Sequence, residues 1–340
     1  MPESPNSGKR GKAAWFGVRP VFLIAGAVAL LGFGVVFGIS LDIATRPKPK
    51  PVVAAQVPVQ PSRQYVPPII TAPDAPDTAS IFAGDPLHKE TLAKPPEEQA
   101  LALNAVPSSA TNGQTVIAVV IDDMGLDRAR ALKMIELKGP LTLSLMTYAD
   151  GLPGLVDLAH KGGHEILAHL PMQPLDPKEH PGPGALLVNM DEATIRRVMA
   201  ADLDSWKGYV GVNNHMGSRF TQDRTRMTVV MEELKSRGLL WLDSKTIGDT
   251  TGPAAARTAG VPYVERDVFL DNVETVAAVT AQLEILAATA KSHGTAIGIG
   301  HPHDSTIAAL KQWLPGLAAR GIVLVPITEV LKRRTVRAPG

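Results

Sequence analysis

From about residue 113 onward, short apolar runs alternate with helical patterns, and this alternation constrains the fold more than any other feature of the chain. The run "TVIAVVID" (115–122) predicts a buried strand, and "DRARALKMIEL" after it predicts a helix. The alternation recurs down to "IVLVPI" (322–327), with one strand expected over 261–271 and one helix over 305–321. About seven such units, with near-continuous apolar strands, favour an α/β fold. We expect a distorted (β/α) barrel of about seven parallel strands rather than a doubly wound sheet.

The N-terminal region predicts a membrane anchor. Residues 20–41 contain no charged side chain across 22 positions, and a bilayer core needs roughly 20 apolar residues in a helix. Four basic residues precede this run, so residues 1–19 are expected in the cytoplasm. A cleaved signal peptide is the alternative, but its apolar region would be unusually long and no A-x-A site follows it clearly. We therefore expect a single-pass protein of the inner (cytoplasmic) membrane, with the remaining chain on the periplasmic side.

Residues 42–112 hold 13 prolines and show no lasting apolar period, which is typical of a disordered linker. The barrel is expected over 113–333 and a solvated tail over 334–340. A net charge of +1 gives no reason to expect nucleic acid. No G-x-G-x-x-G or G-x-x-x-x-G-K motif opens a helix, so nucleotide binding has no support. Cysteine is absent, so any metal must be held by histidine and carboxylate.

Polar residues recur where the expected strands end, which is the edge that carries the chemistry of such barrels. Four of the nine histidines fall at these positions. The strand ends, in chain order, carry Asp122–Asp123, His169, Asn213–Asn214–His215, Asp243, Asp271, and His301 with His303.

Each of these residues also has a purely structural explanation. Aspartates commonly cap helices or close turns, and a lone histidine is more often a hydrogen-bonded core residue. Their coincidence on several strands argues against that explanation for the whole set. Adjacent buried carboxylates such as Asp122 and Asp123 repel each other, and a bound divalent cation relieves the repulsion. Imidazole and carboxylate without thiolate suit Zn²⁺, or another divalent metal, in a catalytic site.

The strand-end motifs resemble those of the divergent polysaccharide deacetylase family over roughly 115–330. "IDDMG" is similar to its Asp-Asp-Gly motif, "GHEILAHLPMQ" to its Gly-His-Glu-Ile-x-x-His motif, and "IGIGH" to its last strand. The resemblance implies Asp122 as general base, Asp123 and His169 as metal ligands, and His301 as general acid. The chain departs from the family where Gln173 replaces a histidine and where the Arg-x-Pro-(Phe/Tyr) motif is absent. Loss of this histidine is compatible with an inactive metal site, or with a ligand supplied by another strand. We expect the second, with His215 as the spare strand-end histidine that supplies the missing ligand.

Two functions follow from this resemblance. The first is a hydrolase that removes acetyl groups from a cell-envelope polysaccharide or amino sugar, with a metal polarising the carbonyl. The second is a non-catalytic envelope protein that uses the same barrel to bind glycan or a partner protein. His303 competes with His301 for the acid position, because the proline between them leaves the direction of both rings open. The candidate substrate contacts are Asn214, Arg219, Asp243, Asp271 and His303.

Overall fold

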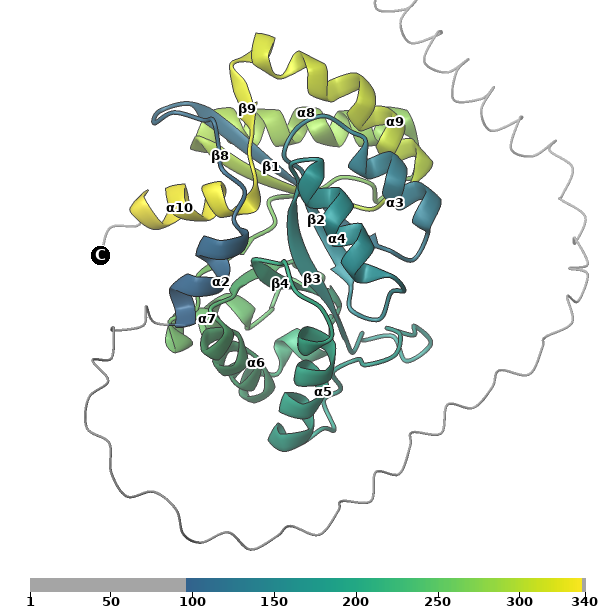
Figure 1. The fold of residues 1–340 in the computed structure, drawn as a ribbon, viewed down its shortest axis with the longest axis vertical. Coiled ribbons are helices and arrows are strands. Elements are labelled where there is room, and N and C mark those ends of the chain that lie inside the picture. The colour runs from purple at the N-terminus through teal and green to yellow at the C-terminus, as the bar shows by residue number, and fades with distance from the viewer. Residues whose placement is uncertain (1–95, 338–340) are drawn as a thin grey trace, which may run out of the picture. The chain divides into compact units, whose positions relative to one another are not determined.

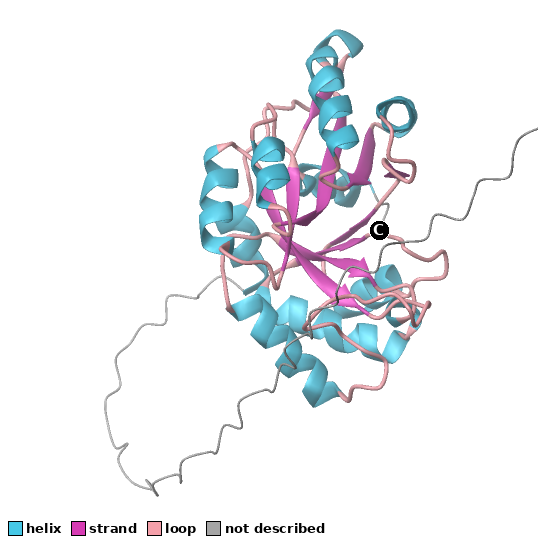
Figure 2. Cartoon of the chain, turned by 90° about the vertical axis from the view of Figure 1, so that its right-hand side faces the viewer, coloured by secondary structure: helices cyan, strands magenta, loops and turns pink. Residues whose placement is uncertain are grey.

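The computed structural model describes residues 96–337, so the predicted cytoplasmic segment, the anchor at 20–41 and most of the predicted linker lie outside the described range. A curled sheet of nine strands, all paired in parallel, runs through this domain, and helices surround it (Figures 1 and 2). This α/β architecture is consistent with the expected distorted barrel, although it has nine strands rather than about seven. Within residues 96–337, none of the helices combines the length and apolarity needed to cross a bilayer.

The strands are β1 (Thr115–Met124), β2 (Thr142–Met146), β3 (Glu165–Met172), β4 (Gly211–Met216), β5 (Leu240–Asp243), β6 (Tyr263–Glu265), β7 (Val268–Phe269), β8 (Thr295–Gly300) and β9 (Ile322–Leu324). The helices are α2 (Pro96–Asn104), α3 (Arg128–Ile135), α4 (Leu152–Lys161), α5 (Glu192–Asp204), α6 (Arg224–Arg237), α7 (Gly252–Ala259), α8 (Val276–His293), α9 (Asp304–Trp313) and α10 (Ile327–Arg337). Three short 3-10 turns, η1 (Phe220–Gln222), η2 (Leu314–Gly316) and η3 (Ala318–Arg320), complete the described elements.

The two edge strands of the sheet are consecutive in the sequence. Its strand order is β6-β5-β4-β3-β2-β1-β8-β7, so β6 and β7 lie at opposite ends although they are consecutive in sequence. The prediction of a single strand over 261–271 is therefore wrong. Tyr263 pairs with β5, whereas Phe269 pairs with β8. A change of pairing partner is a long-range event that a continuous apolar pattern does not reveal.

β1 is an interior strand of the sheet and has neighbours on both sides. β8 pairs with it along Val116–Ile121, while β2 pairs with its second half and β9 pairs with its first three residues. The expected helix over 305–321 is also interrupted, because α9 ends at Trp313 and η2 and η3 follow. Pro315 lies in this interruption, where it cannot continue an α-helical hydrogen-bond ladder.

Two apolar layers form on the two faces of the sheet. Alternate residues of β1 separate between them: Val116, Ala118 and Val120 join one cluster, while Ile117 and Val119 join the other. The smaller cluster includes Ile327, Val330 and Leu331 of α10, and the larger one includes residues of the surrounding helices. Burial on both faces explains why the strands are almost continuously apolar, as parallel strands generally are.

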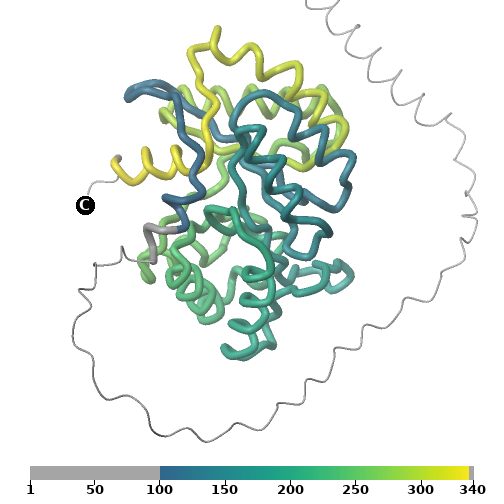
Figure 3. The backbone as a smooth tube through the Cα atoms, in the orientation of Figure 1, coloured from purple at the N-terminus to yellow at the C-terminus, as the bar shows by residue number. Residues whose placement is uncertain are grey.

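Both ends of the described chain pack on the domain, and this changes two predicted boundaries. Helix α2 lies inside the range assigned to the linker, yet Asn104 donates to the Tyr209 carbonyl over 3.2 Å. Helix α10 continues to Arg337, so residues 334–337 are helical rather than part of a tail. Figure 3 traces the end of α2 in blue and α10 in yellow on the same side of the domain.

The "GHE" part of the second motif serves the fold and not the candidate site. Glu165 is fully buried and accepts hydrogen bonds from the backbone N–H groups of Val106 and Thr328 over 3.1 and 3.0 Å. Its carboxylate thus holds the segment after α2 and the first turn of α10. His164 accepts from the Leu141 N–H through Nδ1, so its Nε2 carries the proton that is donated to the Ile135 carbonyl. Burial lowers the pKa of His164.

Candidate metal centre

The carboxyl end of β1 bends so that two adjacent carboxylates face one site. Asp122 continues the inward series of Val116, Ala118 and Val120, so regular alternation would turn Asp123 to the opposite face. The pairing with β2 slips between Ile121 and Met124, as in a β-bulge, and Asp123 has a φ of +55°. Aspartate tolerates this left-handed conformation better than most residues. The turn that brings both carboxylates inward therefore lies at Asp123 itself, before Gly125.

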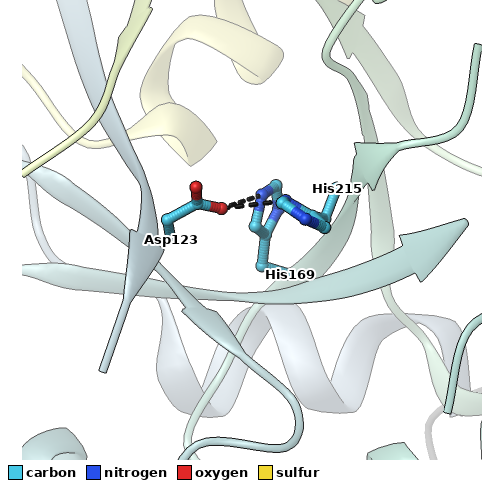
Figure 4. A group of neighbouring side chains, drawn as sticks. All are labelled: Asp123, His169 and His215. Carbon is cyan, nitrogen blue, oxygen red and sulfur yellow. Dashed lines mark ion pairs between the residues drawn. The ribbon is translucent and has the colours of Figure 1, made fainter. Parts of the chain in front are cut away.

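Three side chains converge beyond this bend. Asp123 Oδ1 lies 2.9 Å from His215 Nδ1 and 3.3 Å from His169 Nε2 (Figure 4). Neither approach has the geometry of a hydrogen bond, and Asp123 Oδ1 is buried without a hydrogen-bond partner among the described residues. His169 and His215 lie on neighbouring strands, two positions apart in register, so both rings reach the same face. An oxygen and two ring nitrogens at these separations fit a divalent cation, and this donor set suits zinc.

The charges of the three groups depend on one another. Burial alone would raise the pKa of Asp123, but the imidazoles of His169 and His215 outweigh it and hold that pKa well below its usual range. For His169, burial alone would lower the pKa, but the charges of Asp122 and Asp123 raise it. Asp122 differs, because burial raises its pKa despite the opposing influence of His169 and His301. The two adjacent carboxyl groups therefore titrate in opposite directions from the ordinary value.

Asn213 links the base candidate to a ligand candidate through one buried amide. Its Nδ2 donates to Asp122 Oδ1 over 2.8 Å and to Ser244 Oγ over 3.1 Å. Its Oδ1 accepts from Ser144 Oγ and, over 2.8 Å, from His169 Nδ1. Because an amide oxygen can only accept, the proton of neutral His169 lies on Nδ1 and leaves the Nε2 lone pair for a metal.

His301 faces Asp123 from the other side of the site. Its Nε2 lies 4.0 Å from Asp123 Oδ2, while its Nδ1 lies 3.0 Å from Asp271 Oδ1. Asp271 also accepts from the His301 N–H and from Thr306 Oγ1, so the carboxylate is held rigidly. Burial alone would lower the pKa of His301, but the hydrogen bond to Asp271 and the charge of Asp122 raise it to about 9. The ring is therefore an imidazolium at neutral pH in the absence of a metal.

A cavity of about 440 Å³ opens above these groups. Among residues 96–337, the non-glycine residues with positive φ are Asp123, Met216 and Lys245, and all three line this cavity. Backbone strain of this kind is concentrated at functional sites. The cavity is lined by Asp122, Asp123, His169, Asn214, His215, Met216, Ser244, Lys245, Thr246, Arg266, Phe269, Ile299 and His301.

The structure places the five predicted substrate contacts differently from one another. Asn214 lines the cavity, but its amide already bonds the Met216 carbonyl and the Ser244 N–H. The other four, Arg219, Asp243, Asp271 and His303, do not line it. Asp243 has both oxygens taken by the Lys245 N–H and by Thr250 Oγ1.

Arg219 is exposed and joins Gln173 through its backbone N–H. Gln173 itself accepts the Val188 N–H through Oε1 over 2.8 Å and lies outside the cavity lining, so it shapes the loop after β3. The position vacated by the family's second histidine is thus structural here, and His215 from β4 stands beside Asp123 instead.

Several residues of the site are absent from the sequence prediction. The sequence pattern includes Asn213 only as part of a strand end, and it does not indicate Ser144, Ser244, Arg266 or Phe269. The Arg266 guanidinium donates to the Ser244 and Lys245 carbonyls and lies over the Phe269 ring at 5.1 Å. Strand alternation is the signal that could have found Ser244, because it lies two residues after inward Leu242.

A curled parallel sheet with carboxylates and imidazoles at the carboxyl ends of its strands defines the class of this protein, an α/β barrel-like domain with a candidate metal centre. The sequence model of the divergent polysaccharide deacetylase family matches residues 119–331. The chain belongs to this family, which confirms the resemblance seen in the motifs.

Known relatives are similar to this chain over about two thirds of its length. The chain is 33% identical over 235 residues to the uncharacterized protein YibQ of Escherichia coli K12, covering 69% of this chain and 72% of the relative. It is 32% identical over 235 residues to an uncharacterized protein of Haemophilus influenzae, covering 69% and 83%. The crystal structure of uncharacterized protein ATU2773 from Agrobacterium tumefaciens C58 has a TM-score of 0.65 at 30% identity, covering 69% of this chain and 94% of that chain.

Proposed function

We propose that this protein is a metal-dependent hydrolase that removes acetyl groups from a cell-envelope polysaccharide or amino sugar. One observation carries the proposal: Asp123, His169 and His215 converge beside Asp122 and His301 in a single cavity. Membership of the divergent polysaccharide deacetylase family supports the reaction class. Fold alone does not determine chemistry, so the argument rests on the roles that these side chains can perform.

The three-ligand set fits zinc, because catalytic zinc generally has three protein ligands and one open position. The ion would supply Lewis-acid chemistry by polarising the acetyl carbonyl. Asp122, held by Asn213, would accept the proton of the attacking water when it is in its carboxylate form. His301, held as an imidazolium by Asp271, would donate a proton to the departing amine or alkoxide. The base and acid candidates approach the ligand set from β1 and β8, which pair directly in the sheet.

Lys245, Thr246 and Phe269 give the cavity wall a cation, a hydroxyl and an aromatic ring. Sugars are bound by such combinations of polar groups and apolar faces. The cavity volume of about 440 Å³ falls in the range of small-molecule sites, so we propose that it takes a single sugar residue of a longer chain.

We also propose that residues 20–41 retain the protein in the inner membrane with this domain on the periplasmic side. The uncharged run and the basic residues before it support this location. N-terminal sequencing of protein from membranes should give a start before residue 20, and protease should reach the linker only from the periplasmic face. A mature start after residue 40 would exclude a retained anchor.

The reaction is tested by loading the full chain with zinc and measuring acetate release from an N-acetylated amino-sugar oligomer. Asp122→Asn should abolish acetate release while the zinc content stays at the wild-type value, because Asp122 is assigned the role of base and not ligand. His301→Ala should lower the rate by about a hundredfold or more, the usual scale for losing a general acid.

Ligand loss is the matched comparison. His215→Ala should lose the zinc ion of this centre, and the activity with it, while the circular dichroism spectrum stays unchanged, since His215 lies at the partly exposed edge of the site. Absence of acetate release from the zinc-loaded wild type, on both amide and ester substrates, would favour the non-catalytic glycan-binding function instead.

A further inference from the structure

The loop after β8 brings a second pair of imidazoles together. The His303 N–H donates to the His301 carbonyl over 2.8 Å, which closes a three-residue turn around Pro302. Proline fixes φ near −65°, so this turn is restrained before any ligand binds. The two rings lie with their centroids 5.7 Å apart, on the same side of the turn. Two imidazoles held this close form half of a metal-ligand set.

Asp271 and Glu274 supply carboxylates to the same place. Asp271 Oδ1 faces His301 Nδ1, while its Oδ2 is held by the His301 N–H and Thr306. Glu274 Oε2 lies 3.6 Å from His303 Nδ1. Ligand atoms of Asp271, His301 and His303 all lie within 4.8 Å of one another. Tetrahedral zinc separates its ligands by about 3.4 Å, so the widest pair needs to close by little more than about 1 Å.

The His303 side chain is available for such a role. His303 precedes α9 as its N-cap, but its imidazole makes no capping hydrogen bond, and about a third of the side chain is exposed. The positive end of α9 opposes a cation there, with the equivalent of about half a charge. Two full negative charges, on Asp271 and Glu274, outweigh it. This second group shares no ligand with Asp123, His169 and His215.

We propose that Asp271, His301 and His303, with Glu274 as a fourth ligand, form a second divalent-cation site whose occupation inhibits the enzyme. Binding a cation at Nδ1 of His301 displaces the proton shared with Asp271, and that proton passes to solvent. The ring then becomes a neutral metal ligand whose remaining Nε2 proton is held more tightly than that of an imidazolium. His301 can no longer protonate a leaving group, so the same ion that supports the reaction at one site stops it at the other. The inhibitory effect rests on the proposed function, whereas the second site does not.

Equilibrium dialysis of the full chain against zinc, followed by metal analysis, tests the site without any activity. Wild type should bind two zinc ions per chain, and His303→Ala should bind one. His215→Ala should also bind one zinc ion. The double variant His215→Ala with His303→Ala should bind none. Glu274→Gln, at an exposed position, should weaken the second binding step about tenfold without changing the first. His293→Gln on α8 is the control for losing a histidine that belongs to neither group, and it should bind two.

Activity gives the second measurement. The acetate-release rate of wild type should rise with zinc concentration and then fall. For His303→Ala, the fall should begin at a zinc concentration at least tenfold higher. Each rate is scaled to the maximum rate of the same protein. One zinc ion per chain in both wild type and His303→Ala would overturn the second site, whatever the activity. Two zinc ions without any hydrolysis would leave the second site standing and overturn the proposed reaction. Two zinc ions with no falling limb would overturn the inhibitory role.

Discussion

Asn213 joins the two halves of the centre through a single amide. The carboxylate of Asp122 and the imidazole of His169 come from different strands, and each bonds one end of the Asn213 side chain. Hydrogen bonds behind a metal ligand fix its tautomer and its direction, and removing them usually weakens metal binding by 10–100-fold. The position of the base and the direction of one ligand therefore depend on the same residue.

Asn213→Ala should lower zinc affinity by about 10–100-fold, because His169 loses the acceptor that holds its Nδ1 proton. Competition with a chromogenic chelator measures this affinity directly. Ser144→Ala is the control, since it removes a different donor to the same oxygen and leaves the Asn213 contacts with His169 and Asp122 in place. Equal zinc affinity in wild type and Asn213→Ala would show that the amide does not orient the ligand.

The sequence pattern predicts that Asp123, His169 and His215 lie at one edge of the sheet, because the carboxyl ends of parallel strands meet there. It could not show which alternate residues of a strand point inward, because these strands are apolar on both faces. For that reason Asp243, on the outer side of β5, was expected in the site, whereas Asn213 was not. The left-handed conformation of Asp123 depends on the slipped pairing with β2, which a local pattern does not contain.

At the level of elements, the sheet is held by strands that approach closely where side chains are small. Gly211 of β4 pairs with Leu240 of β5, and a Cβ at this glycine would lie 2.5 Å from the Leu240 backbone oxygen. A backbone atom cannot turn aside as a side chain does. β4 also carries Asn213 and His215, so the distance between β4 and β5 affects where these two side chains lie in the candidate metal centre.

Gly211→Ala should lower the free energy of unfolding by about 1–3 kcal/mol, the usual cost of forcing extra volume into a packed region. Urea denaturation followed by circular dichroism measures the change. Gly248→Ala is the matched control, because no heavy atom lies within 4 Å of a Cβ built there, and it should change stability by less than about 0.5 kcal/mol. An equal decrease in the free energy of unfolding in the two variants would contradict the close approach of the strands.

His164 fastens the end of α3 to the starts of β2 and β3 only in its neutral form. Burial lowers its pKa in the folded chain, whereas the unfolded chain titrates near 6.5. Between these two pKa values only the unfolded chain binds the proton. The contribution of His164 to the free energy of unfolding is therefore fully present above about pH 6.5 and is lost as the pH falls.

The unfolding free energy should therefore fall below about pH 6.5 by up to about 1.4 kcal/mol per pH unit from this group alone. Urea denaturation of wild type and His164→Gln between pH 5 and pH 8 isolates the effect, since the variant should have the shallower slope. Parallel curves for His164→Gln and wild type would contradict the assignment.

At the level of the whole molecule, the domain reaches further along the chain in both directions than its apolar strands indicate. The predicted strands cover most of the sheet, but the composition of the linker gave no sign of α2, and the basic C-terminus gave no sign of α10. Both helices depend on long-range contacts: Asn104 bonds the Tyr209 carbonyl, and Glu165 holds Val106 and Thr328. Contacts of that kind are absent from any local window of sequence.

A fragment that begins at residue 113 should fold, but with lower stability than one that begins at residue 96. The shorter fragment loses the packing of Leu101 and two hydrogen bonds, which together are worth about 2 kcal/mol. Thermal melting of the two fragments measures the difference. Coincident melting curves would mean that α2 contributes nothing to the domain, and an insoluble shorter fragment would mean that it contributes much more.

The interior position of β1 has a consequence for the order in which the protein is made. β1 is the first strand to leave the ribosome, but its pairs with β8 and β9 join Val116 to Thr295 and Thr115 to Ile322. β2 can pair with the second half of β1 early, but the edge of β1 that pairs with β8 stays unpaired through most of synthesis. An unpaired apolar edge is the condition under which nascent chains aggregate or need chaperones. The hairpin-like local contacts that let other domains fold piecemeal are missing from a wholly parallel sheet. We therefore expect the pairing of β1 to be completed only after the last strand has been translated.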